Sequence, residues 1–233
     1  MTCKDQDREK DVLIVGVTGR RHIVKESLDA VESATRKALR AICAAIPAGT
    51  RVLLDSGLAV GADSIAARVC AAESAADETF PMRLRAVLPM SREKYRDDFK
   101  GDELQGFETL LANAKEIVEL PEAEVFDRIA QYSKLRDYLV ERADILLAFW
   151  SGDESEVKPG GTVDVVLSKR RVFQQEGRGA ILSIATPELK RVKEKDGTKR
   201  YEPEEGVDAG RIVLERFGRE ESALRLEKIL KDR

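Results

Sequence analysis

Short apolar runs that alternate with longer amphipathic segments are the feature that most limits the fold of this 233-residue chain. Six runs have the length and the Val, Ile and Leu content of strands, and they span residues 12–17, 51–57, 82–89, 116–121, 144–150 and 179–186. Segments of helical periodicity lie between them, over residues 25–46, 62–76, 92–99, 102–114, 124–142 and 161–174. Nearly continuous apolar strands separated by helices are typical of a parallel sheet covered on both faces. The sequence therefore predicts an α/β fold with a doubly wound, mostly parallel six-stranded sheet.

Composition divides the chain into three parts. Residues 1–10 are charged and are predicted to form a flexible N-terminus, whereas residues 11–186 carry the α/β pattern. Residues 187–233 are more polar and predict a small C-terminal extension, with a hairpin turning at Asp196-Gly197 and one or two charged helices after it. Within residues 190–200, six basic residues outnumber two acidic ones, which predicts either a solvated hairpin or a weak polyanion site.

The overall charge and composition narrow the function classes. Lys and Arg number 40 against 43 Asp and Glu, so the net charge of −3 indicates no general affinity for nucleic acid or membrane. Aromatic residues make up 5% and include one Trp, which also disfavours nucleic acid as a partner. No apolar run approaches the roughly 18 residues that cross a bilayer. Scattered cysteines and an N-terminus without a signal-peptide pattern predict a cytoplasmic protein with reduced thiols.

A single histidine, His22, limits the available chemistry. Any Ser-His-Asp or Cys-His mechanism would have to use this one residue. A zinc site built on histidines is nearly excluded for the same reason. We therefore expect neither a metal nor a resident cofactor.

The residues that follow each strand are the first place to look for a site, because doubly wound sheets bind ligands beyond the carboxyl ends of their strands. Gly16, Thr18, Gly19, Arg20 and Arg21 end the first strand and begin the loop after it. The glycines allow close backbone approach, and the hydroxyl and two guanidinium groups suit phosphate. The alternative interpretation is a tight turn with solvated arginines.

Two later loops lead directly into helices. The first contains Ser56, Gly57, Leu58, Gly61 and Asp63. The start of a helix attracts anions through its unpaired N–H groups, but Asp63 could cap those groups and repel phosphate, or bind a ribose hydroxyl instead. The second loop contains Gly160, Gly161 and Thr162. Two such loops at one edge suit a ligand with two anionic or polar ends, such as a nucleotide or nucleotide sugar.

The segment after the third strand begins at Pro89 and carries two aromatic residues, Tyr95 and Phe99. It could form a lid or a wall on which a base stacks. We favour a surface helix in which the two rings, four residues apart, form the buried stripe.

Five segments taken together resemble the SLOG superfamily: VGVTGRR, LLDSGLAVGADSIAA, AVLPMSREKYRDDF, RDYLVERADILLAFW and PGGTVDVV. This group of Rossmann-like domains includes the Lonely Guy phosphoribohydrolases, the DNA-processing protein A family and ligand-sensing domains of bacterial defence systems. SGLAVGAD is similar to a loop of DNA-processing protein A, and PGGT is similar to the phosphate loop of Lonely Guy enzymes. The resemblance spans about residues 11–186 and implies a Rossmann-like sheet and a homodimer or higher homo-oligomer.

The resemblance to Lonely Guy enzymes is incomplete at the residues that perform their chemistry. Their catalytic arginine matches Arg136, but their acid lies three residues past the loop threonine, where this chain has Val165. The nearest carboxylate, Asp164, is one residue earlier, which rotates it by about 100° on a helix. If the chain is an enzyme of this kind, Arg136 and Asp164 are its catalytic residues: Arg136 would hold the phosphate, and Asp164 or Glu141 would position water or the ribose hydroxyls.

Three functions follow from these residues. We favour a binding module that senses a nucleotide-derived small molecule (a nucleotide, cyclic nucleotide or ADP-ribose type), without turnover and with a separate effector protein as partner. The cradle would be Ser56, Gly57, Gly61, Gly161 and Thr162, and the phosphate would be neutralised by Arg20, Arg21 and Arg136. The alternative is a nucleoside 5′-monophosphate phosphoribohydrolase that cleaves the N-glycosidic bond. Single-stranded DNA binding is disfavoured on charge and aromatic content.

Overall fold

The computed structural model describes residues 12–155, 157–193, 199–218 and 221–231. The predicted flexible N-terminus, residues 1–10, and the predicted turn at Asp196-Gly197 lie outside the described residues.

The described residues form one seven-stranded sheet and a separate two-stranded hairpin. The sheet has the order β4-β3-β2-β1-β5-β6-β9, in which β1 to β6 are parallel and β9 is antiparallel. Its strands are β1 (Val12–Gly19), β2 (Arg51–Ser56), β3 (Met82–Leu88), β4 (Glu116–Glu119), β5 (Ile145–Trp150), β6 (Ala180–Ala185) and β9 (Ile212–Arg216). The hairpin pairs β7 (Leu189–Lys193) with β8 (Lys199–Pro203). The helices are η1 (Lys25–Ser27), α1 (Leu28–Ala45), α2 (Ala62–Ala76), α3 (Arg92–Arg96), α4 (Asp102–Asn113), α5 (Arg128–Arg142), α6 (Thr162–Glu176) and α7 (Glu221–Lys231).

The predicted doubly wound, mostly parallel sheet is confirmed, but its strand count is corrected from six to seven. One or two charged helices were expected in the region that contains Ile212–Arg216, but this segment pairs with β6 as β9. Among the described residues after 186, helix is confined to α7, which packs against α1. The residues after 186 therefore also complete the main sheet. Within the described residues, no helix combines the length and apolarity needed to cross a membrane.

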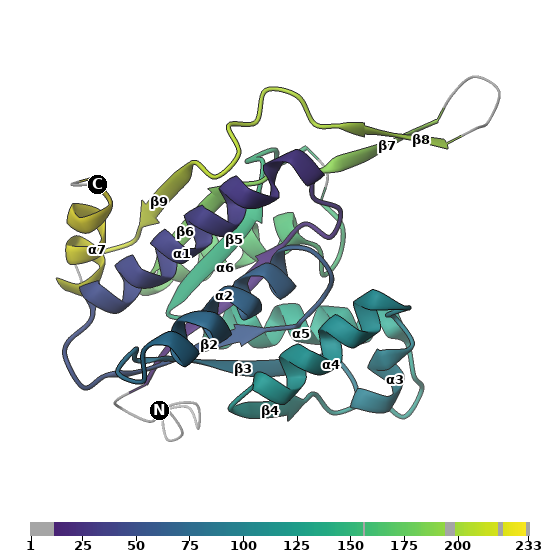
Figure 1. Cartoon of the computed structure of the whole chain (residues 1–233), viewed down its shortest axis with the longest axis horizontal. Coiled ribbons are helices and arrows are strands. Elements are labelled where there is room, and N and C mark those ends of the chain that lie inside the picture. Colours follow the sequence, from purple (N-terminus) through teal and green to yellow (C-terminus); the bar gives the residue numbers. More distant parts are fainter. Residues whose placement is uncertain (1–11, 156, 194–198, 219–220, 232–233) are drawn as a thin grey trace.

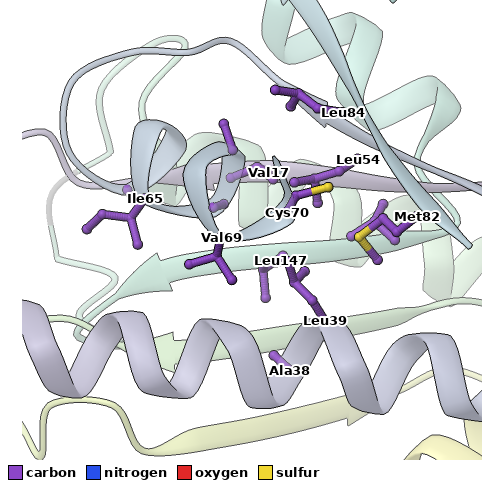
Figure 2. Packing of buried hydrophobic residues seen from close by; sticks show 14 of the residues in the cluster. Val17, Ala38, Leu39, Leu54, Ile65, Val69, Cys70, Met82, Leu84 and Leu147 are labelled. Atoms are coloured by element: carbon purple, nitrogen blue, oxygen red, sulfur yellow. The ribbon is translucent and has the colours of Figure 1, made fainter. Parts of the chain in front are cut away.

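Helices cover both faces of the sheet (Figure 1). Side chains of α1, α2 and α4 share one apolar cluster with alternate residues of the strands, and α6 contributes to a second cluster on the other face. Figure 2 shows the first cluster, in which Cys70 and Val69 of α2 and Leu39 of α1 lie near Val17 and Leu54 of the strands. Because helices cover both faces of the sheet, the central strands are apolar along their length.

Helix α5 crosses β1 very closely. A Cβ at Gly16 would lie 2.9 Å from the Cβ of Ala143 and 3.3 Å from Leu139 Cδ2. Gly16 is also three residues inside the strand, since β1 continues to Gly19. The structure therefore uses Gly16 for packing beneath α5 and places it away from the edge where a ligand was predicted.

A buried ion pair links β2 to β3, its neighbour on the side away from β1. Asp55 on β2 and Arg85 on β3 are cross-strand partners, and two hydrogen bonds of 2.7 Å join their side chains. Asp55 is fully buried and Arg85 is nearly so. Arg85 also lies 3.6 Å from Glu116 on β4. Burial raises the pKa of Asp55, whereas the Arg85 hydrogen bonds and charge lower it.

The strand order places a topological switch point between β1 and β5. The chain leaves β1 toward β2 on one side and later returns to β5 on the other side. In open α/β sheets the crevice at such a point, beyond the carboxyl ends of the strands, is where ligands bind. The loops after β1 and β5 begin side by side here, because Gly19 and Phe149 are register partners.

Candidate ligand-binding site at the carboxyl edge of the sheet

The loop between β2 and α2 uses its polar groups internally. The Ser56 hydroxyl donates to the Asp63 carbonyl and accepts from the Leu58 N–H, both at 3.2 Å. The Asp63 carboxylate accepts hydrogen bonds from the N–H groups of Gly57 and Ala59. The Ser56 hydroxyl and the Gly57 N–H, which were predicted to cradle a phosphate, are thus satisfied by the loop itself.

Glycines in this loop and at the end of β1 allow two backbones to meet. Gly61 has a φ of +92°, and a Cβ there would lie 2.4 Å from the Arg20 carbonyl oxygen. A Cβ at Gly19 would lie 2.3 Å from the Cβ of Ala62. The Ala62 N–H donates to the same Arg20 carbonyl at 3.0 Å. These contacts make Gly19 and Gly61 packing positions that hold the end of β1 against α2.

Arg20 and Arg21 reach to opposite sides of the end of β1. Arg20 pairs with Glu188 at 2.8 Å, beyond the end of β6. The Arg21 guanidinium lies 5.2 Å from the centre of the Tyr132 ring on α5. The Tyr132 hydroxyl in turn donates to the Asp98 carboxylate. The two arginines therefore flank the crevice instead of meeting at one phosphate.

Asp63 has an unusual titration because it is buried. Burial raises the pKa of its carboxyl to about 7, against the lowering effects of the Arg21 charge and of the Gly57 and Ala59 N–H groups. In the unfolded chain the pKa of this carboxyl would be about 3.9. The folded state therefore holds the proton more tightly than the unfolded state over this interval, and stability falls as the pH rises through it.

We expect this to appear as a pH-dependent difference between the wild type and Asp63→Asn. The stability that Asp63 contributes is fully present below about pH 4, and it is lost as the pH rises to the folded-state pKa of about 7. Urea unfolding over this range should show the wild type losing free energy of unfolding relative to Asp63→Asn. A difference that stays constant or grows with pH would contradict the assignment.

The loop between β5 and α6 is built differently. The Gly161 N–H donates to the Lys158 carbonyl at 2.8 Å, and the Gly160 N–H donates to the Asp164 carboxylate at 2.9 Å. Within the described part of the chain, the N–H groups of Thr162 and Val163 have no acceptor. They lie in the first turn of α6, where the partial positive charge of a helix is concentrated. The start of α6 therefore has N–H donors left for an anion.

Arg136, beside this helix start, and Arg20, at the end of β1, carry unused donors. Arg136 Nη1 lies 3.3 Å from each oxygen of Asp164, and Arg136 Nη2 lies 2.9 Å from Asp137. The Nε atoms of Arg136 and Arg20 are buried and have no hydrogen-bond partner among the described residues. Buried donors are almost always paired in proteins, so these two are available to an external acceptor.

The beginning of α5 lies between the two helix starts. A Cβ at Gly57 would lie 2.9 Å from Leu135 Cδ2, and a Cβ at Gly160 would lie 3.3 Å from the Tyr132 carbonyl oxygen. The predicted shared cleft is therefore divided. The structure brings Arg136, Gly160, Gly161, Thr162 and Asp164 together on one side, and it places Ser56, Gly57, Leu58, Gly61 and Asp63 on the other.

Several predicted residues lie outside this grouping. Thr18 is buried near the end of β1, between the two sides. The Pro89 carbonyl accepts a 2.7 Å hydrogen bond from the Gln131 side chain and so lies beneath α5. Glu141 is exposed in the last turn of α5, near the N-terminal edge of the sheet. None of these three contacts the first turn of α6 in the described hydrogen bonds and ion pairs.

Sequence reasoning missed the residues at the start of α5. Gln131 is fully buried, and its Oε1 has no partner among the described residues. Tyr132 contacts both Arg21 and Asp98. The one local signal was Asp127, which caps α5 by accepting from the Ile129 N–H at 2.9 Å and so shows where the helix begins. It does not show which strands the helix crosses.

The aromatic segment after β3 belongs to the core. Tyr95 and Phe99 are buried, with ring centres 5.1 Å apart, so the predicted buried stripe is confirmed and these rings form no base-stacking wall. The Tyr95 hydroxyl donates to the Gly57 carbonyl at 2.9 Å. His22 is exposed beside Tyr201 of the hairpin. Among the described residues, no three His, Cys, Asp or Glu side chains gather in a way that could hold a metal ion.

Comparisons with known proteins give a limited result. No model of a known protein family matches the chain, and no curated protein matches it. DNA processing protein A from Streptococcus pneumoniae is similar at 16% identity and a TM-score of 0.44, over 72% of this chain and 48% of that one. DNA processing protein A from Helicobacter pylori is similar at 15% identity and a TM-score of 0.40, over 71% of this chain and 62% of that one. At these values the likeness concerns the fold alone.

The comparisons also correct one prediction. The Helicobacter pylori structure is described for its single-stranded DNA binding mode, so a protein similar in fold does bind nucleic acid. The prediction that disfavoured nucleic acid as a partner conflicts with this comparison. It relied on a net charge of −3 and 5% aromatic residues, which are averages over the whole chain. Such averages do not measure the charge of one surface. The resemblance to Lonely Guy enzymes stays a prediction.

Proposed function

We propose that this protein binds a phosphate-bearing, nucleotide-derived small molecule at the start of α6. The phosphate would accept hydrogen bonds from the N–H groups of Thr162 and Val163 and from Arg136. This site lies beside the switch point of the sheet, where such folds hold their ligands. The motif resemblance to ligand-sensing SLOG domains supports the same class of ligand. The predicted homo-oligomer and the separate effector protein stay predictions.

The observation that carries the proposal is that several hydrogen-bond donors without an acceptor lie together at the start of α6. The first turn of α6 has two N–H groups without an acceptor among the described residues, and the adjacent Arg136 has a buried Nε without one. Arg136 also holds Asp164 at 3.3 Å, which is longer than the roughly 2.8 Å of a strong charge-assisted bond. A phosphate at this place would satisfy all three donors.

Binding without turnover is the better supported mechanism. Asp164 accepts from the Gly160 N–H at 2.9 Å, from Arg136 at 3.3 Å and from the Ser168 hydroxyl at 3.4 Å. A carboxylate whose oxygens accept from three donors is held in place by the protein and has less capacity left to orient a water molecule. The phosphoribohydrolase alternative is favoured by one observation, the contact between Arg136 and Asp164. Under our proposal, prolonged incubation with AMP releases no free adenine.

Replacing Arg136 by glutamine should weaken the binding of AMP by about 10–100-fold, because a hydrogen bond to a charged group contributes roughly 1.5–3 kcal/mol. Isothermal titration calorimetry with AMP, a cyclic nucleotide, ADP-ribose and inorganic phosphate measures the loss and identifies the preferred class of ligand.

Arg178→Gln is the matched control, since it removes the same charge at the far end of α6, where Arg178 pairs with Glu176 at 3.0 Å. It should leave the affinity unchanged. Equal losses in the two variants would indicate a general charge effect and contradict the site. Absence of binding by the wild type to all four compounds at millimolar concentration would also contradict it.

A further inference from the structure

A groove of about 770 Å³ runs between α2 and α4. The two helices lie side by side over one face of the sheet (Figure 1). Each leads from the carboxyl edge back to the start of the next parallel strand, so both run in the same direction. The groove is therefore on the opposite face of the sheet from α6 and from the phosphate site proposed above. Its volume lies within the roughly 300–1,000 Å³ that is typical of small-molecule sites.

Small side chains keep the walls of this groove apart. The α2 wall extends from Ser64 to Ala75, and the α4 wall extends from Asp102 to Asn113. At about 1.5 Å per residue, each wall is about 16 Å long. A Cβ at Gly106 would meet nothing within 4 Å, so the space beside it is open. The groove thus has the shape of an elongated molecule.

The inside of the groove is mainly apolar. Its most buried lining residues, which form its floor, are Leu58, Phe99, Phe107 and Leu110. The two hydroxyl groups in the walls already donate to nearby carbonyls. Ser64 donates to Gly61 at 2.8 Å, and Thr109 donates to Gln105 at 2.8 Å. Along most of its length the groove therefore offers van der Waals contact and few hydrogen bonds.

One end of the groove is negatively charged. Asp102 and Glu103 line it in the first turn of α4, and both are exposed. Within the described residues, neither carboxylate forms an ion pair or accepts a side-chain hydrogen bond. The positive end of the helix dipole, about half a charge, offsets only part of these two charges. Arg68, which also lines the groove, is already paired with Glu32 of α1 at 3.1 Å.

We propose that this groove binds an elongated apolar molecule with a cationic end, of the class of long-chain amines. The apolar chain lies between α2 and α4, and the ammonium group lies beside Asp102 and Glu103. Opposite charges attract at this end, whereas the carboxylate of a fatty acid would meet like charge there. This site is separate from the phosphate site, so it does not depend on the proposed function.

Isothermal titration calorimetry with decylamine, decanol and decanoate, each below the concentration at which it aggregates, tests the proposal. The three compounds share one chain length and differ in charge. Decylamine should bind about two- to fivefold more tightly than decanol, because an exposed ion pair contributes little, and decanoate should bind most weakly. Octylamine, two methylene groups shorter, should bind about 15-fold more weakly than decylamine.

Two variants locate the binding site. Gly106→Leu places a side chain in the open space and should weaken decylamine binding by about tenfold or more. Ala112→Leu is its matched control, since Ala112 is an exposed residue of α4 outside the groove lining, and it should leave the affinity unchanged. Asp102→Asn with Glu103→Gln should remove the preference for decylamine and keep the affinity for decanol.

The proposal is overturned if the wild type does not bind decylamine, if decanoate binds as tightly as decylamine, or if Gly106→Leu and Ala112→Leu have equal effects. Urea unfolding of both leucine variants shows whether each is folded. Arg136→Gln should retain decylamine binding, so failure of the groove and failure of the phosphate site give different results.

Discussion

Replacing Arg85 by methionine should lower the free energy of unfolding by about 3–5 kcal/mol, because it leaves a buried charge without its partner. Asp55 is fully buried, and Arg85 supplies two 2.7 Å hydrogen bonds to its carboxylate. Without Arg85, burial would raise the pKa of Asp55 further, since the arginine is the main group that lowers it. Urea denaturation at neutral pH measures the loss.

Two comparisons identify the cause of this loss. Arg68→Met breaks an exposed pair with Glu32 of 3.1 Å and should cost less than about 1 kcal/mol. The double variant Arg85→Met with Asp55→Leu removes both charges and should recover most of the stability. If Arg85→Met cost no more than Arg68→Met, the buried pair would not be the strong constraint that its geometry indicates.

Gly61→Ala is expected to have the second large effect, a loss of about 2–5 kcal/mol. The backbone of Gly61 has a φ of +92°, which side-chain-bearing residues adopt only with strain of about 1–3 kcal/mol. The new Cβ would also lie 2.4 Å from the Arg20 carbonyl oxygen and 2.5 Å from that of Arg21. Forcing two backbones apart adds about 1–3 kcal/mol. Thermal or urea unfolding measures the change.

Gly106→Ala is expected to raise the stability of the protein. Gly106 lies within α4, and a Cβ there would meet nothing within 4 Å. The substitution should therefore stabilise the protein by about 0.5–1 kcal/mol, since alanine loses less conformational entropy in a helix. A Gly61→Ala protein as stable as the Gly106→Ala protein would show that the contact between the β1 end and α2 is loose.

The parallel part of the sheet was predictable because of its burial. The strands β1, β2, β3, β5 and β6 are mostly covered on both faces, so each forms an apolar run that local sequence reveals. β9 was missed for the opposite reason. Its five residues are half-buried or exposed. Its place is decided by pairing with β6, about 30 residues earlier in the chain. Short edge strands of this kind carry too little local signal.

The candidate site was predictable only in its local parts. Gly160, Gly161 and Thr162 form a recognisable loop before a helix, and the structure keeps them with Arg136. The role of Asp63 was open, and the structure resolves it as the internal partner of its own loop. The contact of Arg21 with Tyr132 joins residues far apart in sequence. No periodicity or motif encodes such a contact, because it depends on how α5 crosses the sheet.

The most direct test of phosphate binding at the start of α6 follows backbone amide signals by nitrogen-edited NMR during a titration with AMP. The largest shifts should occur at Thr162 and Val163, with a shift of the Arg136 Nε signal at the same AMP concentration. The amides of Gly57 and Ala59, which already donate to Asp63, should change little. Shifts concentrated at Gly57 and Ala59, or no shifts at millimolar AMP, would contradict the proposed site.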